Sequence, residues 1–484
     1  MQKKSLKLNF FFNMLLNVSK VAFPLITAPY VARVLEPDGV GLFNFSNTYV
    51  GYFALFALFG VPMYGIREVA KLRDDKKKLN DFVSEVFSAT VITTFLCSAI
   101  FVLSVIVIPQ LNQNALLFLV AGVVLYTSPF RIDWFFSGKE EFGFITFRSL
   151  LIKTISVICL FAFVREKKDL FIYVVIFICS SIINEIWNFI RLRNTGIRLH
   201  FTLKVTRHIK SSMALFSAVV AASIYTYLDS IMLGFLTDYA QVGFYNSATH
   251  ISKSLLPIAT SLAVVALPRL SYYLKDKKWD DINVLVEKSI SVIAFLCFPI
   301  TFAVISIAPE FIPLFYGPLF GGAILPLQII IGVVVAIGFS NLFGVQILTG
   351  LGRDKLLLIM TLVGAAVNFS LNLFLIPSYG AVGAAIASVL AEFLVMIVGL
   401  IFVVKKTPVV LNGFGEVFCS CCAASLLFVV KIILSKYISG WPMIISFCIC
   451  GGFLYIIVQY LMKNSSEMMM INLIAKKIKE RKNI

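Results

Sequence analysis

Two short runs of polar residues interrupt apolar stretches of this sequence at the spacing of one helical face. They are Asn13, Asn17 and Lys20 in the first run, and Asn246, His250 and Lys253 in the second. Steps of three and four residues place side chains on the same side of a helix. An ammonium group facing lipid is costly, so we expect both faces to line a water-filled cavity. Ammonium groups suit anions there, and amides suit hydroxyl groups.

Three further basic residues add to this positive charge. Arg131, Arg148 and Lys153 lie in apolar segments near the side of the membrane where the N-terminus is expected. We expect them to form a cationic funnel that attracts an anionic ligand from the cytoplasm. The alternative is structural: Arg131 pairs with Asp133 near a helix end, and Arg148 extends its head group to the membrane surface.

Asp229 is the acidic residue of greatest interest, because it lies in an apolar segment toward the outer side. It forms either a structural ion pair or a site that takes up protons during a transport cycle. No group of His, Cys, Asp or Glu has the spacing of a metal site, and no catalytic constellation is found. We therefore expect no metal, no cofactor and no enzyme activity.

The composition predicts the environment of these residues. Of the 484 residues, 59% are hydrophobic, and the mean hydropathy is +0.93. Soluble domains are only about 45–50% apolar. Many apolar runs exceed the roughly 20 residues that span a bilayer as a helix. The net charge of +17 would favour nucleic acid on a soluble protein, but membrane topology explains it here, so lipid and not nucleic acid is the expected partner.

The distribution of basic residues predicts the orientation. The apolar runs form about fourteen expected transmembrane helices, among them 114–136 and 211–236. Short outer turns are expected between 10–32 and 39–60, at Glu36, Pro37 and Asp38, and between 356–376 and 380–404. With the N-terminus in the cytoplasm, thirty of the 42 Lys and Arg residues fall in the inner segments and five in the outer loops. Basic residues concentrate on the cytoplasmic side of membrane proteins, so both termini are expected there. The tail at 467–481 alternates apolar and basic residues, which predicts an amphipathic helix on the inner leaflet.

A short internal repeat predicts the domain organisation. The segment 40–46, Val-Gly-Leu-Phe-Asn-Phe-Ser, is similar to 242–247, Val-Gly-Phe-Tyr-Asn-Ser. Their offset corresponds to six helices, which favours two parallel six-helix lobes around a central cavity. The expected all-α polytopic fold has lobes at 1–200 and 201–404. Residues 405–484 add two transmembrane helices and the cytoplasmic amphipathic tail.

Five motifs along most of the chain carry a resemblance to a known family. They are Pro29–Leu35 with Gly39–Gly41, Tyr64–Ala70, Tyr227–Gly234, Pro268–Leu270 and Tyr379–Ala385. In order and spacing they resemble Wzx-type polysaccharide transporters of the multidrug/oligosaccharidyl-lipid/polysaccharide exporter superfamily.

That resemblance implies a two-lobed flippase of the bacterial cytoplasmic (inner) membrane. Its cargo would be undecaprenyl-pyrophosphate-linked oligosaccharide repeat units. They would move from the cytoplasmic to the outer leaflet by alternating access, for capsule, O-antigen or exopolysaccharide synthesis. The polar stripes and basic residues named above would then bind the pyrophosphate and the sugars. Implied partners are a polymerase and other polysaccharide-assembly proteins.

Three other functions stay open. A teichoic-acid precursor flippase would have nearly the same sequence features. A drug or cation antiporter of the same superfamily would need an acidic cavity, which the basic residues of the two stripes disfavour. A membrane polysaccharide polymerase or ligase would need catalytic groups outside, usually on a sizeable loop, and the expected outer loops are short.

Overall fold

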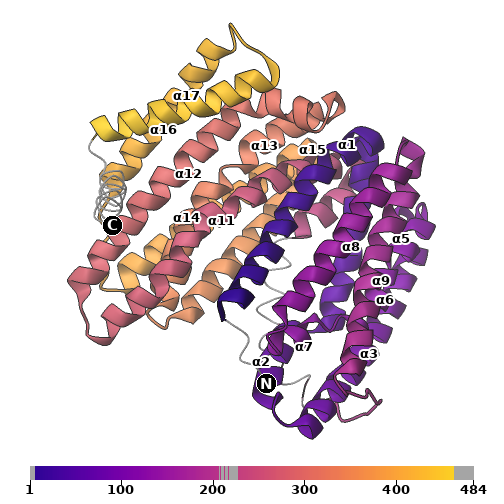
Figure 1. The fold of residues 1–484 in the computed structure, drawn as a ribbon. Coiled ribbons are helices and arrows are strands. Elements are labelled where there is room, and N and C mark those ends of the chain that lie inside the picture. The colour runs from indigo at the N-terminus through magenta and orange to yellow at the C-terminus, as the bar shows by residue number, and fades with distance from the viewer. Residues whose placement is uncertain (1–5, 207, 209–211, 213–215, 217–226, 463–484) are drawn as a thin grey trace, which may run out of the picture. The chain divides into compact units, whose positions relative to one another are not determined.

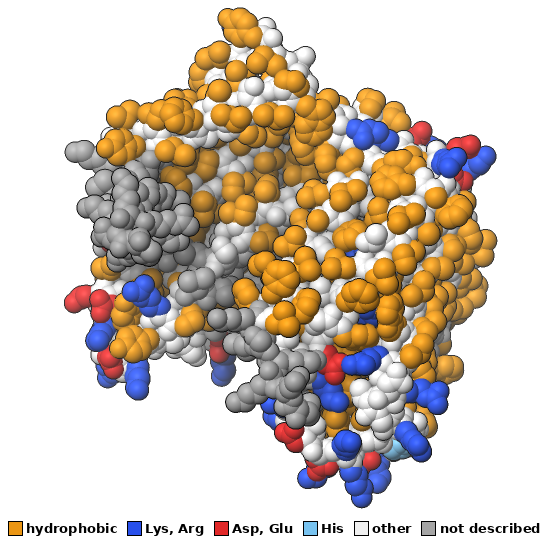
Figure 2. Space-filling model, viewed as in Figure 1, with side chains coloured by type: hydrophobic (Ala, Val, Ile, Leu, Met, Phe, Trp, Pro, Cys, Tyr) orange, Lys and Arg blue, Asp and Glu red, His pale blue; other side chains and the backbone are white. Residues whose placement is uncertain are grey.

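The computed structural model describes residues 6–206, 208, 212, 216 and 227–462. All regular elements in these residues are helices, and eleven are long and apolar enough to cross a membrane. Large apolar side chains are widely exposed; Phe95 and Phe374 are 72% and 76% exposed. On the face in Figure 2, apolar side chains cover the helices and charged ones gather near helix ends. The predicted all-α polytopic membrane fold is confirmed.

The chain divides into two compact units, Met1–Gly243 and Phe244–Ile484. The lobes expected at 1–200 and 201–404 stay a prediction. So does the number of fourteen helices, because the helix expected at 211–236 is described almost only as Tyr227–Leu236. The amphipathic tail expected at 467–481 lies outside the described residues.

Unit 1 is a bundle built around a long, kinked first helix (Figure 1). Its elements, up to the start of α11, are α1 (Leu6–Leu58), α2 (Val61–Leu72), α3 (Lys76–Val107), α4 (Pro109–Asn112), α5 (Ala115–Ala121), α6 (Val123–Tyr126), η1 (Ser128–Phe130), α7 (Asp133–Gly138), α8 (Phe142–Phe163), η2 (Lys167–Asp169), α9 (Leu170–Asn194) and Tyr227–Leu236.

Unit 2 holds the other long helices. They are α11 (Tyr239–Lys275, whose first turn belongs to unit 1), α12 (Trp279–Phe315), η3 (Pro318–Ala323), α13 (Ile324–Ile330), α14 (Val333–Asn341), the π-helix η4 (Leu342–Thr349), α15 (Asp354–Lys406), α16 (Phe414–Leu434) and α17 (Gly440–Leu461). The last two helices pack on α12, where Lys431 Nζ lies 3.0 Å from Glu310 Oε1.

Two outer turns of the expected topology are kinks one residue wide. In α1, Glu36 leaves the helical conformation, with φ 58° and ψ 175°. The next residue is Pro37, which disfavours helical geometry in the residue before it and then begins a helix well. In α15, Gly380 takes φ 53° and ψ −129°, a conformation that favours glycine. Each long element is thus two helices joined end to end.

The repeated motif has a packing role in unit 1. A Cβ atom on Gly41 would lie 1.7 Å from the Tyr239 carbonyl oxygen, and one on Gly243 would lie 2.3 Å from the Pro37 carbonyl oxygen. The second half of α1 and the start of α11 therefore cross at backbone contact. The two motifs share a glycine because each glycine admits the backbone of the other segment.

The segment expected as one helix at 114–136 is broken into α5, α6, η1 and α7. Pro129 lies in η1, and Arg131 follows it with φ −74° and ψ 72°, outside the helical region. Proline cannot donate a hydrogen bond to a continuous helix, which favours the break here. Arg131 therefore lies between two helical segments and not within a continuous helix.

The chain after α9 runs in extended form along α3. Backbone N–H groups of alternate residues donate to polar side chains one helical turn apart: Arg198 to Asn80 Oδ1 at 2.7 Å, His200 to Ser84 Oγ at 3.4 Å and Thr202 to Ser88 Oγ at 3.0 Å. Two extended residues advance about 6.6 Å and four helical residues about 6 Å, so the two spacings match. This docking fixes the segment to unit 1.

Candidate functional site

The first polar stripe is a connected row on α1. Asn17 Nδ2 donates to Asn13 Oδ1 at 3.4 Å, and Lys20 Nζ donates to Asn17 Oδ1 at 3.1 Å. All three side chains are exposed. Their spacing of four and three residues in a regular helix produces this row, as the sequence predicts. The row ends in the exposed ammonium group of Lys20.

The structure brings Lys153 of α8 to the same place. Its Nζ donates to Ser19 Oγ at 3.3 Å and lies 5.6 Å from the centre of the Phe23 ring. Lys153 is half-buried and within electrostatic range of Lys20. Throughout the described part of the chain, no carboxylate contacts either ammonium group. Two positive charges that repel each other here favour a bound anion.

The second stripe lies on α11 in unit 2. Asn246 and His250 are half-buried, Lys253 is exposed, and the His250 ring is within electrostatic range of the Lys253 ammonium group. His250 Nδ1 is buried and has no hydrogen-bond partner among the described residues. The three predicted residues therefore share a helix face, and their role in binding stays a prediction.

Arg148 has a different environment from the lysines. Its side chain is 2% exposed, and its Nη2 lies 2.7 Å from Asp133 Oδ1. Its Nη1 donates to Asn188 Oδ1, and Asn188 Nδ2 donates to Asp133 Oδ1 at 3.1 Å. Asp133 therefore pairs with Arg148 and not with Arg131, and the Arg148 head group is buried rather than extended to the membrane surface. Both residues contribute to a structural network in this conformation.

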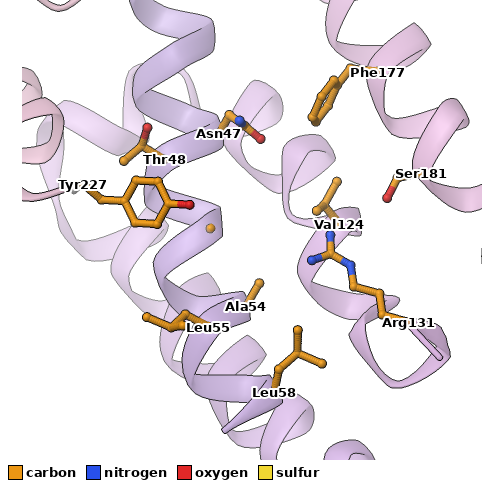
Figure 3. A pocket seen from close by; sticks show the side chains of 11 residues that line it. Asn47, Thr48, Ala54, Leu55, Leu58, Val124, Arg131, Phe177, Ser181 and Tyr227 are labelled. Atoms are coloured by element: carbon orange, nitrogen blue, oxygen red, sulfur yellow. The ribbon is translucent and has the colours of Figure 1, made fainter. Parts of the chain in front are cut away.

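Arg131 lines a cavity of about 330 Å³ inside unit 1. Its Nε donates to Glu185 Oε1 at 3.2 Å, and its side chain is 31% exposed. Figure 3 shows the guanidinium group and the Asn47 amide pointing into this space. The lining residues are Asn47, Thr48, Gly51, Ala54, Leu55, Leu58, Val124, Arg131, Phe177, Ser181 and Tyr227. The cavity combines one cation, several hydroxyl groups and apolar walls.

Sequence reasoning missed most of this lining. Asn47 and Thr48 had a usable signal, because Asn44, Asn47, Thr48 and Gly51 follow the same stripe spacing along an apolar helix. Ser181 had none, since a serine in an apolar helix commonly bonds to its own backbone.

Asp229 is buried, 6% exposed, in the helix Tyr227–Leu236 of unit 1. It lies within electrostatic range of Tyr52 in α1. Its assignment to an ion pair or to coupling stays a hypothesis.

The fold and these polar sites define a polytopic membrane protein with cationic groups inside its helical units. Residues 6–274, more than half of the chain, match the model of the family described as polysaccharide biosynthesis protein. The chain belongs to this family of membrane proteins.

Curated relatives agree with this membership. A putative O-antigen transporter of Escherichia coli (strain K12) is 25% identical over 415 residues, which cover 83% of this chain and 97% of the relative. A putative O-antigen transporter of Shigella dysenteriae is 22% identical, and the match covers 81% of this chain and 98% of the relative. The names denote transporters and not enzymes, which agrees with the expected absence of enzyme activity.

Solved structures show the same fold. The lipid II flippase MurJ in its inward closed conformation superposes with a TM-score of 0.77 at 15% identity, covering 94% of this chain and 98% of that one. An inward-facing multidrug resistance MATE family transporter of the MOP superfamily gives 0.60 at 13% identity, covering 82% and 94%. The family model and the curated relatives confirm the resemblance to polysaccharide transporters that the sequence motifs predict, and the solved structures confirm the fold.

Proposed function

We propose that this protein is a flippase for lipid-linked polysaccharide precursors. In this proposal it moves undecaprenyl-pyrophosphate-linked oligosaccharide from the cytoplasmic to the outer leaflet by alternating access. It acts in the bacterial cytoplasmic membrane with both termini in the cytoplasm. Family membership and the full-length similarity to putative O-antigen transporters support the transport of a polysaccharide precursor.

The observation that carries the proposal is the pair of ammonium groups on α1 and α8. Lys153 Nζ donates to the hydroxyl group of Ser19, the residue before Lys20, and no described carboxylate contacts either lysine. A pyrophosphate supplies the negative charge that this cluster lacks, and charge-assisted hydrogen bonds to phosphate oxygens are strong. The amides of Asn13 and Asn17 lie beside it, where they suit hydroxyl groups of the first sugar.

Three carboxylates in the helices are already paired, which disfavours a cation antiporter. Asp133 contacts Arg148, Glu185 contacts Arg131, and Glu310 contacts Lys431. A carboxylate that is already paired attracts a cationic substrate only weakly. We therefore place an anionic cargo first.

The membrane potential supplies a driving force that moves such an anionic cargo outward. Moving one elementary charge across the membrane changes its free energy by about 2.3 kcal/mol per 100 mV. Moving two negative charges to the positive outer side is therefore favourable by roughly 4.6 kcal/mol at that potential. Asp229 is our candidate for an additional proton step. Loss of transport when the pH gradient is removed at constant potential would favour that step over a potential-only mechanism.

The direct test is flipping in proteoliposomes. Fluorescent undecaprenyl-pyrophosphate-linked oligosaccharide is placed in both leaflets, and the fraction accessible to a quencher outside is followed over time. The intact protein is compared with protein-free liposomes and with the variant Lys20→Ala, Lys253→Ala, which removes one ammonium group from each stripe.

Three results are distinguishable. Flipping by the intact protein and poor flipping by the variant supports both the function and the stripes. Equal flipping by both contradicts the role of the stripes and leaves the function standing. No flipping above protein-free liposomes contradicts the proposed function.

A further inference from the structure

The cavity in unit 1 contains a charged group with unused hydrogen-bonding capacity. Arg131 uses its Nε to bind Glu185 Oε1 at 3.2 Å, and no acceptor among the described residues binds its two Nη groups. These two groups carry four N–H donors in one plane. Figure 3 shows the guanidinium group directed into the cavity. A ligand there meets a planar, two-pronged donor.

Glu185 fixes the direction of that donor. Its side chain is 6% exposed, and its Oε1 also accepts a hydrogen bond from Ser181 Oγ at 3.4 Å. Because Nε is held by a buried carboxylate, the Nη edge of the guanidinium group faces the open space. This edge matches the two oxygens of a carboxylate, which bind arginine in a bidentate manner.

Charge distinguishes this cavity from the lysine cluster on α1 and α8. The charges of Arg131 and Glu185 sum to zero, whereas Lys20 and Lys153 together supply two positive charges without a described counter-ion. A pyrophosphate carries several negative charges and is attracted more strongly to the lysine cluster. A single carboxylate on an otherwise neutral ligand fits the cavity better.

The remaining lining suits a sugar. Thr48 and Tyr227 offer hydroxyl groups, Asn47 offers an amide, and the Phe177 ring offers an apolar surface for the C–H groups of a pyranose. The volume of about 330 Å³ is near the small end of ligand pockets, which range over roughly 300–1,000 Å³. The space therefore suits a single sugar residue and not a whole oligosaccharide.

We propose that this cavity is a recognition subsite for one carboxylate-bearing sugar of the cargo, with Arg131 as the residue that determines the specificity. This proposal rests on the proposed flippase function. It assigns the acidic sugar to unit 1 and leaves the pyrophosphate to the lysine cluster. Thr48, Tyr227 and Asn47 bind hydroxyl groups of the same sugar residue.

The test compares two small probes on the full-length protein in detergent. Methyl glucuronide and methyl glucoside differ in one group, a carboxylate in place of a hydroxymethyl group. Saturation-transfer NMR titrations measure the affinity of each. We expect the glucuronide to bind about tenfold more tightly or better, the effect of a hydrogen bond to a charged group.

A paired variant isolates the guanidinium group. Removal of Arg131 alone would leave Glu185 buried without its counter-ion, so we use Arg131→Gln with Glu185→Gln, which keeps side-chain size and a hydrogen bond. The matched control is Arg191→Gln with Glu141→Gln, an ion pair at 3.3 Å that also includes a residue of α9 and lies outside the cavity lining. Thermal unfolding verifies that both variants fold.

The outcomes are decisive in either direction. The proposal stands when the intact protein and the control prefer the glucuronide and the Arg131 variant does not. Equal affinity for the two probes, no binding of either, or a preference retained in the Arg131 variant overturns it. Inorganic pyrophosphate is also titrated against the bound glucuronide. If pyrophosphate binds more tightly than the glucuronide and displaces it, the cavity is a phosphate site and the proposal is overturned.

Failure of this subsite is separable from failure of the flippase function. The same preparations are assayed for flipping with neutral and with glucuronate-containing lipid-linked oligosaccharide. Flipping of both cargoes at one rate, without a binding preference, contradicts only the subsite. A glucuronide preference without flipping contradicts only the proposed function.

Discussion

Lys20 and Arg148 are both basic residues in apolar segments of unit 1, yet their environments are opposite. Lys20 is exposed, contacts an amide and lies near a second ammonium group. Arg148 is 2% exposed and is bound by Asp133 and Asn188. The charge of Arg148 is neutralised by a carboxylate of the protein, whereas the charge of Lys20 has no described counter-ion. The partner of an intramembrane charge in the fold therefore has to be known before the charge is assigned to structure or to function.

The largest effect should come from the lysines. We expect Lys20→Gln with Lys153→Gln to slow flipping about a hundredfold, because each lost hydrogen bond to a charged phosphate is worth roughly tenfold or more. Thermal stability should stay near that of the intact protein. The control is Lys71→Gln with Lys78→Gln, which removes two lysines that are 60% and 72% exposed. If the control variant flips as slowly as the Lys20 and Lys153 variant, the effect is not specific to these two lysines, and the contrast with Arg148 is contradicted.

The second prediction concerns Arg148 itself. We expect Arg148→Gln to lower the free energy of unfolding by about 1–3 kcal/mol, because Asn188 Oδ1 loses its charged donor and Asp133 loses its counter-ion. Urea or thermal unfolding in detergent measures this. By comparison, Arg191→Gln removes one partner of the partly exposed Arg191–Glu141 ion pair and should lower the free energy of unfolding by only about 0–1 kcal/mol. Unchanged stability of the Arg148 variant, with lost transport, would place Arg148 with the lysines as a binding residue.

A smaller effect is expected in the extended segment that docks on α3. Replacement of Ser84 and Ser88 by alanine leaves the His200 and Thr202 N–H groups without their acceptors. We expect a loss of about 1–2 kcal/mol in total and faster amide exchange in residues 198–202. Hydrogen exchange followed by mass spectrometry measures it. Exchange that does not change would show that the segment is held by apolar contacts instead.

The smallest effect tests a charge outside the membrane. The Asp75 carboxyl accepts a hydrogen bond from the Lys78 backbone N–H at 3.0 Å at the start of α3, which lowers its pKa below the ordinary value. A lowered pKa in the folded state adds stability above the unfolded pKa, and this is lost as pH falls through the folded pKa. Unfolding between about pH 5 and 3 should therefore depend less on pH in Asp75→Asn. An identical pH dependence would contradict this.

Much of the fold was predictable because hydrophobicity and helix spacing are local properties. Apolar runs gave the membrane helices, and the residue spacing gave the hydrogen-bonded row from Asn13 to Lys20. The motifs near Gly41 and Gly243 indicated a repeat. Their contact, with each backbone against the other, required the structure. The short outer turn that the sequence predicts at Glu36, Pro37 and Asp38 is a kink at Glu36 in the structure.

The sequence by itself determined an all-helical membrane protein, the family resemblance and which helix faces are polar. It did not determine which charges are neutralised. Arg131 and Glu185 are far apart along the chain, as are Lys20 and Lys153, and no local pattern distinguishes the first pair from the second. Only the tertiary structure decided that one cation meets a carboxylate and another meets a cation, because the energy of a charge depends on its neighbours in space and not on its neighbours in sequence.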